Sequence, residues 1–396
     1  MNFFIISLIK AAIVAFVLLT ALAYLQWLER KLLGHIQLRP GPNRVGPHGL
    51  LQPLADVIKL VTKEGFIPSH VDKFFYLLAP FIAVTLALIP IAVIPFGPEV
   101  NIFGVKTWLQ LTDLSIGVLF VLAISSVGVY GVALAGWASN NKYSLIGGLR
   151  SSAQMISYEL PLALAIASPL LLANSLSFRH IVGQQAGYYL GFIPRWAIFQ
   201  MPFPQIFAFI IFLIAGFAET NRIPFDLPEA ENELVAGYHT EYSSMKFAAF
   251  FMAEYCNMVI SACVATLLFL GGWHPLFPAP YSNAIPVLVF LFFGAIGLYH
   301  GLNPARRRDR FSLPITGIVS IIIALIFLIP ILWPVIIPLF WFCAKVVVLL
   351  FVFIWIRGTL PRFRYDQLMR FAWTFLFPVA VLNLLVTGLF VAVFSK

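Results

Sequence analysis

The sequence predicts an all-α polytopic membrane protein with about ten transmembrane helices and one interfacial amphipathic helix. Of the 396 residues, 61% are hydrophobic and only 10% are charged, and the mean hydropathy is +0.94. A chain of this composition cannot cover an ordinary water-facing surface. Because a helical span needs about 20 apolar residues, the spans can be counted along the chain. We expect them at residues 4–28, 74–95, 113–137, 153–173, 202–220, 247–271, 284–301, 313–333, 335–356 and 371–394.

The connections between these spans are short, and their charges predict an orientation. None is long enough for a separate soluble domain, so we expect residues 1–396 to form one membrane domain. If the amino terminus lies outside, the inner loops carry nineteen of the 25 Lys and Arg residues. This is the positive-inside pattern of a multi-pass protein, so the net charge of +9 needs no nucleic acid to explain it. Both termini are therefore expected outside.

The acidic residues are concentrated in one predicted inner loop, residues 219–246. Six of the sixteen Asp and Glu residues fall between positions 219 and 241, next to apolar segments on both sides. Carboxylates beside hydrocarbon lose hydration, and burial raises their pKa toward physiological pH. Such a cluster can hold or pass protons when its surroundings change.

Glu159, Glu254 and Lys345 are ionisable residues deep within predicted spans, where each is costly enough to be a functional candidate. Glu159 lies about seven residues from the inner end of its span, roughly 10 Å at 1.5 Å per residue. Glu254 lies at a similar depth in its own span, and Lys345 lies near the middle of another. One interpretation is a buried pair of a glutamate with Lys345 that only locks helix packing. A proton path is the other, since the acids outnumber the single lysine.

Residues 49–64 are too short and too charged to span a membrane, but they are periodic. Apolar residues mark one helical face, and Asp56, Lys59 and Lys63 lie on the other face with Gln52. The pattern is typical of an interfacial helix on the inner surface. It could serve as a simple anchor, or its polar stripe could line the mouth of a cavity whose ligand arrives from the lipid.

Two inner segments are basic. Arg39 and Arg44 lie on a loop that Pro and Gly residues keep from forming a helix, and Arg357 and Arg362 belong to the segment RGTLPRFRYDQLMR. Either segment could be a positive-inside anchor. Pro and Gly residues restrict both segments, and the acidic loop is predicted on the same inner side. Together these features instead suggest an ordered surface that docks soluble protein partners.

Several chemistries have no motif to support them. The seven histidines show no HxH or HExxH spacing, and the three cysteines fall inside predicted helices without a CxxC pattern. Nucleotide-binding loops and the GxSxG elbow are also missing from the sequence. Metal binding, disulfides, nucleotide binding and acyl transfer are therefore not expected of this chain.

Four long blocks in the sequence resemble the signature blocks of the H subunit of respiratory complex I, the proton-pumping NADH:quinone oxidoreductase. The mitochondrial counterpart of that family is NADH dehydrogenase subunit 1. The blocks are LERKLLGHIQLRPGPNRVGPHGLLQPLADVIKLVTKE, GWASNNKYSLIGGLRSSAQMISYE, AETNRIPFDLPEAENELVAGYHTEYSSMKFAAFFMAEY and IRGTLPRFRYDQLM. The resemblance covers residues 1 to about 273 and 335 to 396.

The resemblance implies a membrane subunit that forms much of a quinone chamber and contacts the subunits of the hydrophilic arm. Quinone would be the substrate, and this chain would bind no cofactor, because FMN, NADH and the iron–sulfur clusters lie on other subunits. Its partners would be the quinone-module subunits with the terminal iron–sulfur cluster, neighbouring membrane-arm subunits, quinone and lipid. The membrane would be the bacterial cytoplasmic membrane or the mitochondrial inner membrane.

The resemblance also implies roles for individual residues. Residues matching the family's quinone tunnel or its entrance are Glu29, Arg30, Arg39, Asp56, Lys59, Arg357 and Arg362. Residues matching the family's acids between that chamber and the membrane arm, with one basic partner, are Glu159, Glu219, Arg222, Asp226, Glu229, Glu231, Glu233 and Glu254. We add Lys345 to this second group because of its position within a span.

Residues 274–334 exceed the family's usual pattern of about eight spans. They contain two extra apolar segments, which we expect to be a lineage-specific insertion facing lipid or an added subunit. Two other functions stay open at this point. The chain could be the homologous subunit of a membrane-bound hydrogenase or of a ferredoxin- or F420-dependent complex, or it could be a stand-alone secondary transporter, although no internal repeat supports the transporter.

Overall fold

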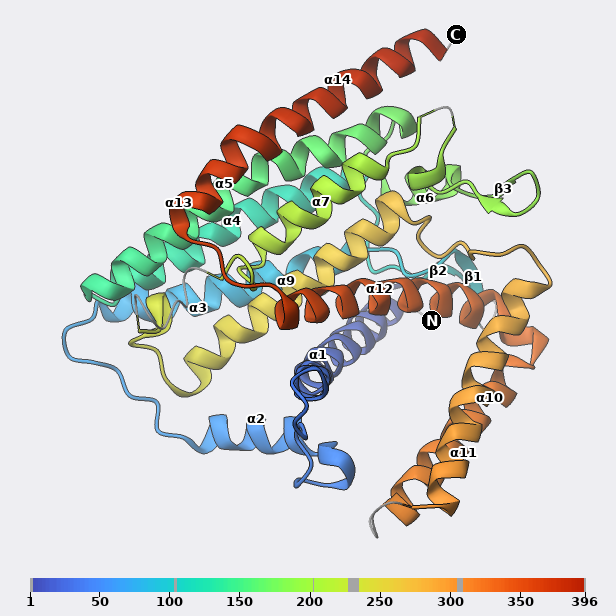
Figure 1. The fold of residues 1–396 in the computed structure, drawn as a ribbon, viewed down its shortest axis with the longest axis horizontal. Coiled ribbons are helices and arrows are strands. Elements are labelled where there is room, and N and C mark those ends of the chain that lie inside the picture. The colour runs from blue at the N-terminus through green and yellow to red at the C-terminus, as the bar shows by residue number, and fades with distance from the viewer. Residues whose placement is uncertain (1–2, 103–104, 202, 227–234, 305–308, 395–396) are drawn as a thin grey trace.

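The chain folds almost entirely into helices (Figure 1). The computed structural model describes residues 3–102, 105–201, 203–226, 235–304 and 309–394. Within these ranges nine helices are long and apolar enough to cross a membrane, which confirms the predicted fold class. The helices are α1 (Phe3–Ile36), α2 (Gln52–Thr62), α3 (Lys73–Leu88), α4 (Gly117–Ala138), α5 (Lys142–Ala173), α6 (Phe178–Gln184), α7 (Ile206–Glu219), α9 (Ser244–Phe269), α10 (Tyr281–Leu302), α11 (Asp309–Phe327), α12 (Trp333–Thr359), α13 (Tyr365–Phe371) and α14 (Phe377–Phe394).

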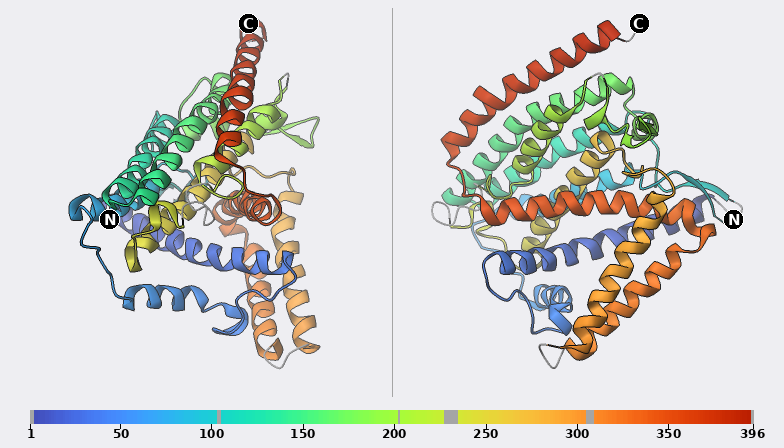
Figure 2. Two further views of the ribbon diagram at one scale, coloured as in Figure 1. Left: turned by 60° about the vertical axis from the view of Figure 1, so that its left-hand side comes forward. Right: turned by 45° about the vertical axis from the view of Figure 1, so that its right-hand side comes forward.

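Helices α3, α4, α5, α7 and α9 form the centre of the bundle, with α14 beside α5 and with α1 and α12 on the opposite side (Figures 1 and 2). A continuous cluster of buried apolar side chains joins them. Small residues allow close approach between neighbours, as expected for helices in lipid. A Cβ atom added to Gly131 of α4, for example, would lie 3.1 Å from Cβ of Ala83 in α3.

Among the helices whose ends differ from the predicted spans, α5 and α7 bear on the position of the acidic residues. Helix α5 begins at Lys142, eleven residues before the predicted position 153, because the Asn141 side chain accepts a hydrogen bond from the Tyr143 amide and caps the helix. Glu159 therefore lies 17 residues from the start of its helix, well beyond the predicted seven. Helix α7 has only 14 residues and starts after the proline-containing stretch that ends at Gln205.

Short antiparallel strand pairs cover the end of the bundle where α1 begins and α14 ends (Figure 1). Strands β1 (Glu99–Ile102) and β2 (Val105–Trp108) form one pair, and β3 (Tyr188–Tyr189) and β4 (Ile193–Pro194) form the other. Helix α6 and these hairpins thus lie on the side that the sequence predicts to be outer.

Helix α2 lies outside the bundle, beside α1 (Figures 1 and 2). It occupies the centre of the predicted interfacial segment, residues 49–64. Leu54, Val57, Ile58 and Val61 are exposed along it. These are most of the apolar face that the sequence predicts.

Helices α10 and α11 form a hairpin that leaves the bundle from one end of α12 (Figures 1 and 2). The two helices touch closely, since a Cβ atom on Gly297 would lie 2.9 Å from Cα of Gly317. A separate apolar cluster around Trp341 attaches the hairpin to α12, where the Trp341 indole donates a hydrogen bond to the Ser282 carbonyl at 3.2 Å. At the other end, His48 lies 3.1 Å from the Ser312 hydroxyl. That the hairpin is a lineage-specific insertion stays a prediction.

The turn η4 (Gly237–His239) packs against α5 so tightly that no side chain fits at the contact. A Cβ atom on Gly147 would lie 2.8 Å from Cα of Gly237. We expect Gly147→Ala to force this turn away from α5 and to destabilise the protein by about 1–3 kcal/mol, as overpacking usually does. The thermal unfolding of the purified protein measures the change.

Gly128→Ala in α4 is the matched control for this substitution. A Cβ atom on Gly128 would have no atom within 4 Å, so replacement there should be neutral or slightly stabilising, because alanine favours the helix over glycine. Equal stabilities of the two variants would contradict the tight contact.

Candidate functional site

A largely buried row of alternating charges connects four separate elements of the fold. We call Arg357, Glu29, Arg222 and Glu254 the charge row. They come from α12, from α1, from the turn after α7 and from α9, respectively. Sequence reasoning had divided these residues between a chamber group and a coupling group. The structure brings them together.

Arg222 is the centre of the charge row. Its guanidinium lies 3.8 Å from the Glu29 carboxylate and 3.7 Å from the Glu254 carboxylate, and only 6% of its side chain is exposed. The guanidinium also lies 4.2 Å from the centre of the Tyr255 ring, which is a favourable cation–π distance. Separations of this size leave room for small movements or for a bridging water.

The two ends of the charge row differ in their surroundings. Glu29 pairs with Arg357 as well as with Arg222, so its buried carboxylate lies between two cations. Glu254 accepts a hydrogen bond from the Tyr238 hydroxyl at 3.1 Å and lies 3.7 Å from Nε2 of His239. Tyr238 and His239 both belong to the turn η4. At its Glu254 end, the charge row therefore contacts the turn η4, which lies in the later part of the acidic loop.

The turn that carries Arg222 is positioned by a buried amide. Gln154 of α5 donates hydrogen bonds from Nε2 to the carbonyls of Ala218 and Phe225, both at 2.8 Å. The same nitrogen lies 3.2 Å from Oδ1 of Asn221. Gln154 thus holds both sides of the turn and fixes the direction of the Arg222 side chain.

Two adjacent serines of α4 hold the other two intramembrane acids. Ser125 donates a hydrogen bond to the carboxylate of Glu219, and Ser126 donates one to the carboxylate of Glu159. Because the serines are consecutive, the two acids approach neighbouring positions on one helix. The structure therefore brings Glu159 and Glu219 together.

Cavities connect these acids with the charge row. One cavity is lined by Glu219, Glu254 and Asn257, of which the last two belong to α9. A second cavity shares Ser125, Glu219 and Asn257 and continues toward α6 along apolar side chains. Polar groups that line a shared hollow can hold ordered water. The cavities thus give a route along which protons could move from Glu254 to Glu219.

Four residues predicted for the chamber entrance lie on the surface near α2. Arg30 of α1 forms an ion pair with Asp56 of α2 at 2.7 Å, and Gln52 donates a hydrogen bond to the same carboxylate at 3.0 Å. The sequence placed Asp56 on one polar face with Lys59 and Lys63, and in the structure Asp56 pairs with Arg30 of α1. Arg39 and Lys59 are exposed.

The second basic segment contacts the beginning of the acidic one. Arg362 pairs with Asp226 at 3.0 Å, and the Phe363 amide donates to the Pro224 carbonyl at 3.1 Å. Glu229, Glu231 and Glu233 lie outside the described residues, so their prediction stays open.

Lys345 does not join the acids. Its ammonium donates hydrogen bonds to the carbonyls of Leu270, Gly272 and His274 at 2.6, 2.8 and 2.6 Å, and it lies 4.1 Å from the Trp196 ring centre. Leu270 follows Glu254 by 16 residues, or about 24 Å along a helix. The interpretation in which Lys345 pairs with a glutamate finds no support among the described residues. The lysine instead caps the far end of α9, where the helix dipole favours a cation.

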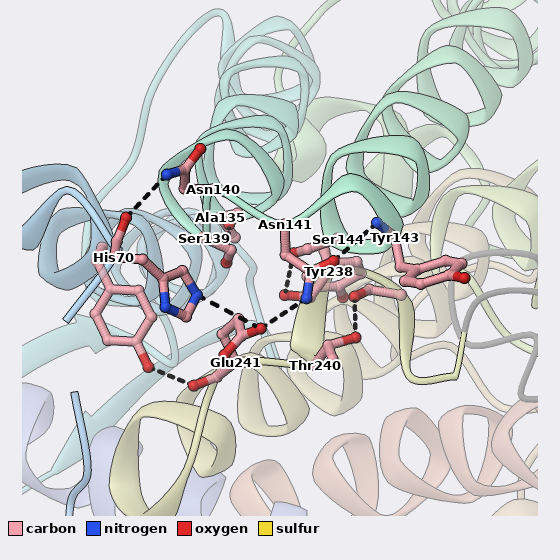
Figure 3. A network of polar contacts seen from close by, with 12 residues as sticks. His70, Ala135, Ser139, Asn140, Asn141, Tyr143, Ser144, Tyr238, Thr240 and Glu241 are labelled. Carbon is pink, nitrogen blue, oxygen red and sulfur yellow. Dashed lines mark hydrogen bonds and ion pairs between the residues drawn. The ribbon is translucent and has the colours of Figure 1, made fainter. Parts of the chain in front are cut away.

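A further polar network surrounds Glu241, which the sequence counted among the six acids but did not assign to the site (Figure 3). Its carboxylate accepts a hydrogen bond from Asn141 at 2.7 Å and lies 3.8 Å from His70. The Tyr76 hydroxyl donates to the Glu241 carbonyl at 2.6 Å. Burial raises the pKa of Tyr242, which stacks on Tyr76. The network joins the loop before α3, the start of α5 and the end of the acidic segment.

Sequence reasoning missed several residues that shape this site. Tyr238, His239, Gln154 and the two serines of α4 carry no distinctive spacing. Tyr238, His239 and Gln154 lie inside the sequence blocks that resemble the family, and this was the only feature of the sequence that could have pointed to them. Within the part of the chain that the structure describes, no group of three or more His, Cys, Asp or Glu side chains could hold a metal ion.

Comparison with known proteins assigns the family. The profile of the NADH dehydrogenase family matches residues 9–307 and 315–388. The chain belongs to this family. The predicted resemblance is thereby confirmed, and the match includes most of α10 and α11.

The chain is similar over its whole length to family members named as H subunits of NADH-quinone oxidoreductase. It is 65% identical to the first such subunit of Solibacter usitatus over 396 residues, which cover 100% of this chain and 99% of the relative. It is 50% identical to the second such subunit of Koribacter versatilis, with 98% of each chain covered. It is 46% identical to the H subunit of Protochlamydia amoebophila, with 94% of each covered.

Removing Arg222, the central cation of the charge row, should destabilise the protein more than removing one of its anions. Arg222→Met leaves the buried Glu29 and Glu254 carboxylates without their shared partner, so we expect a loss of about 3–5 kcal/mol of stability. Adding Glu254→Gln should restore part of this loss, because it removes one uncompensated charge. Thermal unfolding of the assembled complex measures both. Additive losses in the double variant would contradict the shared ion pair.

Proposed function

We propose that this chain forms much of the quinone-binding chamber of NADH:quinone oxidoreductase and couples quinone reduction to proton translocation. As a member of its family, the chain is a membrane subunit of this multisubunit oxidoreductase, respiratory complex I. The observation that carries the proposal is the charge row, because it joins residues expected at the chamber to an acid that faces the intramembrane cavity.

The surface near α2 suits a substrate with a polar head and an apolar tail. Leu54, Val57 and Ile58 are exposed on α2, while Asp56 on the same helix pairs with Arg30 of α1. A quinone arriving from the lipid would keep its isoprenoid tail along the apolar side chains. Its headgroup would move past the Arg30–Asp56 pair toward Glu29 and Arg357. Reduction would take place there, with electrons from an iron–sulfur cluster on a neighbouring subunit.

Quinone reduction would be coupled to proton transfer at Glu254 through the alternating charges of the charge row. Reduction of a quinone consumes protons and changes the charge next to Arg357 and Glu29. Because each member of the charge row is stabilised by its neighbours, a change at one end alters the energy of the carboxylate at the other. Glu254 would then take up or release a proton through the cavity that leads to Glu219 and Glu159.

The orientation and the partners belong to the same proposal. The acidic segment and the basic segment around Arg362 would lie on the cytoplasmic or matrix side and dock the quinone-module subunits. The termini and the two strand pairs would lie on the opposite side. The hydrogenase-type and transporter alternatives are not favoured, since the similar relatives are named as subunits of NADH-quinone oxidoreductase.

Glu254→Gln or Glu159→Gln should impair quinone-linked proton pumping. Each amide keeps the shape of the side chain but cannot carry a proton, whereas NADH oxidation by artificial acceptors bypasses this subunit and should be unchanged. Loss of one proton-transfer group typically costs about 10²–10⁴ in rate. Proton uptake by the complex reconstituted in liposomes gives the measurement.

Glu64→Gln is the matched control, because Glu64 is exposed at the end of α2 and should leave pumping intact. Normal pumping in an assembled Glu159→Gln/Glu254→Gln double variant would contradict the proposed coupling.

A further inference from the structure

Three polar residues follow one face of α9, beginning at the intramembrane acid Glu254. Glu254, Asn257 and Ser261 are separated by three and four residues, which places them on the same side of the helix. Each of them lines at least one of the two cavities next to α9. A polar stripe therefore runs along α9 beside these cavities, and Glu254 is its first member.

Asn257 lies at the junction of the two cavities. Of the residues of α9, all of which the structure describes, it alone lines both. The cavity next to the charge row includes Glu254, and the other cavity continues past Ser261. Glu219 of α7 also lines both cavities. Asn257 thus lies along the route from Glu254 to Glu219.

The polar residues that line both cavities differ in the hydrogen bonds that they can still donate. The Ser125 hydroxyl donates to the Glu219 carboxylate, and the Thr220 hydroxyl donates to the Phe217 carbonyl at 3.1 Å. Each hydroxyl has a single proton, which these bonds already use. The Asn257 side chain takes part in no hydrogen bond with the described part of the chain. Its two N–H donors and its carbonyl oxygen are therefore available to a ligand in the cavities.

The two cavities have the size and the polarity of water sites. Their volumes are about 40 and about 50 Å³, whereas one buried water needs about 10–15 Å³. Buried water is held by about two to four polar partners, and a cavity lined only by apolar groups stays dry. The Asn257 carboxamide and the Glu219 carboxylate supply such partners on opposite walls, from α9 and α7. Water is consequently the ligand that this junction fits.

We propose that Asn257 is a positioning residue that holds ordered water between Glu254 and Glu219. The role rests on the proposed coupling function and deepens it. In the transfer step, the O–H bond of protonated Glu254 breaks and that proton binds to a water molecule. An O–H bond of the water breaks as a new one forms on the Glu219 carboxylate. The step leaves Glu254 as a carboxylate, Glu219 as a carboxylic acid and the water unchanged.

A carboxamide suits this role because it orients water without exchanging a proton. Its nitrogen donates hydrogen bonds and its oxygen accepts them, and it has no ionisable proton near neutral pH. An apolar side chain at the same place would remove the polar partner that keeps water there. The acids at the two ends therefore exchange protons, while Asn257 keeps the water between them in place.

The experiment uses the assembled complex reconstituted in liposomes. Asn257→Leu keeps a branched side chain but cannot bind water, so it should lower quinone-linked proton translocation at least about tenfold. NADH oxidation by artificial acceptors should be unchanged. Asn257→Ser keeps a polar group and leaves space for one more water, so it should retain pumping. A residue that served only as packing would give the opposite order, because leucine fills the site and serine leaves a larger void.

Asn383→Leu is the matched control within the chain. Asn383 of α14 is buried, with 8% of the residue exposed, and donates a hydrogen bond to the Ser168 hydroxyl at 2.9 Å. It is not among the described residues that line the two cavities, so its replacement should lower thermal stability but leave pumping unchanged. Normal pumping in Asn257→Leu would overturn the proposal, as would equal losses in Asn257→Leu and Asn257→Ser.

Glu254→Gln, measured in parallel, separates the water site from the coupling function on which it rests. Impaired pumping in Glu254→Gln together with normal pumping in Asn257→Leu would leave the coupling function standing and remove only the role of Asn257. Normal pumping in both variants would remove both.

Discussion

A single buried guanidinium, shared between two carboxylates from different helices, determines how this protein can work. Arg222 lies between Glu29 of α1 and Glu254 of α9, in a region where a lone charge would cost several kcal/mol to bury. Glu254 loses this cation if Arg222 is removed, whereas Glu29 keeps Arg357 as a second partner. The positions of α1, α7 and α9 are thus tied to one another by electrostatics at this level, and a change of charge at any member is felt by the others.

The elements around Arg222 are held rigidly, whereas the ion pairs of Arg222 itself are loose enough to rearrange. Gln154 fixes the turn that carries Arg222, and the Gly147 contact fixes the turn that carries His239. At the far end of α9, Lys345 satisfies carbonyls that the helix cannot bond itself. The ion pairs of Arg222 are longer than hydrogen bonds, so the polar centre can change while its frame does not.

The sequence predicted the spans because long apolar stretches admit one interpretation, and it identified the acids because charges beside hydrocarbon are rare. It could not predict how deep Glu159 lies, since α5 continues through polar residues that a hydropathy count treats as loop. Lys345 was grouped with the acids because it lies within a span, whereas in the structure backbone carbonyls bind it. The sequence did not single out His239, Ser125 and Ser126, because their contacts with the acids depend on which helices pack together. Packing between segments far apart in the chain cannot be read from local sequence patterns.

Redox-induced infrared difference spectroscopy tests the central claim most directly. If the charge row carries the quinone reaction to Glu254, reduction of quinone in the assembled complex changes the protonation of a buried carboxyl group. The corresponding carboxyl band should be absent in Glu254→Gln and present in Glu64→Gln. An identical difference spectrum in the wild type and in Glu254→Gln would contradict the claim that the quinone reaction reaches this acid.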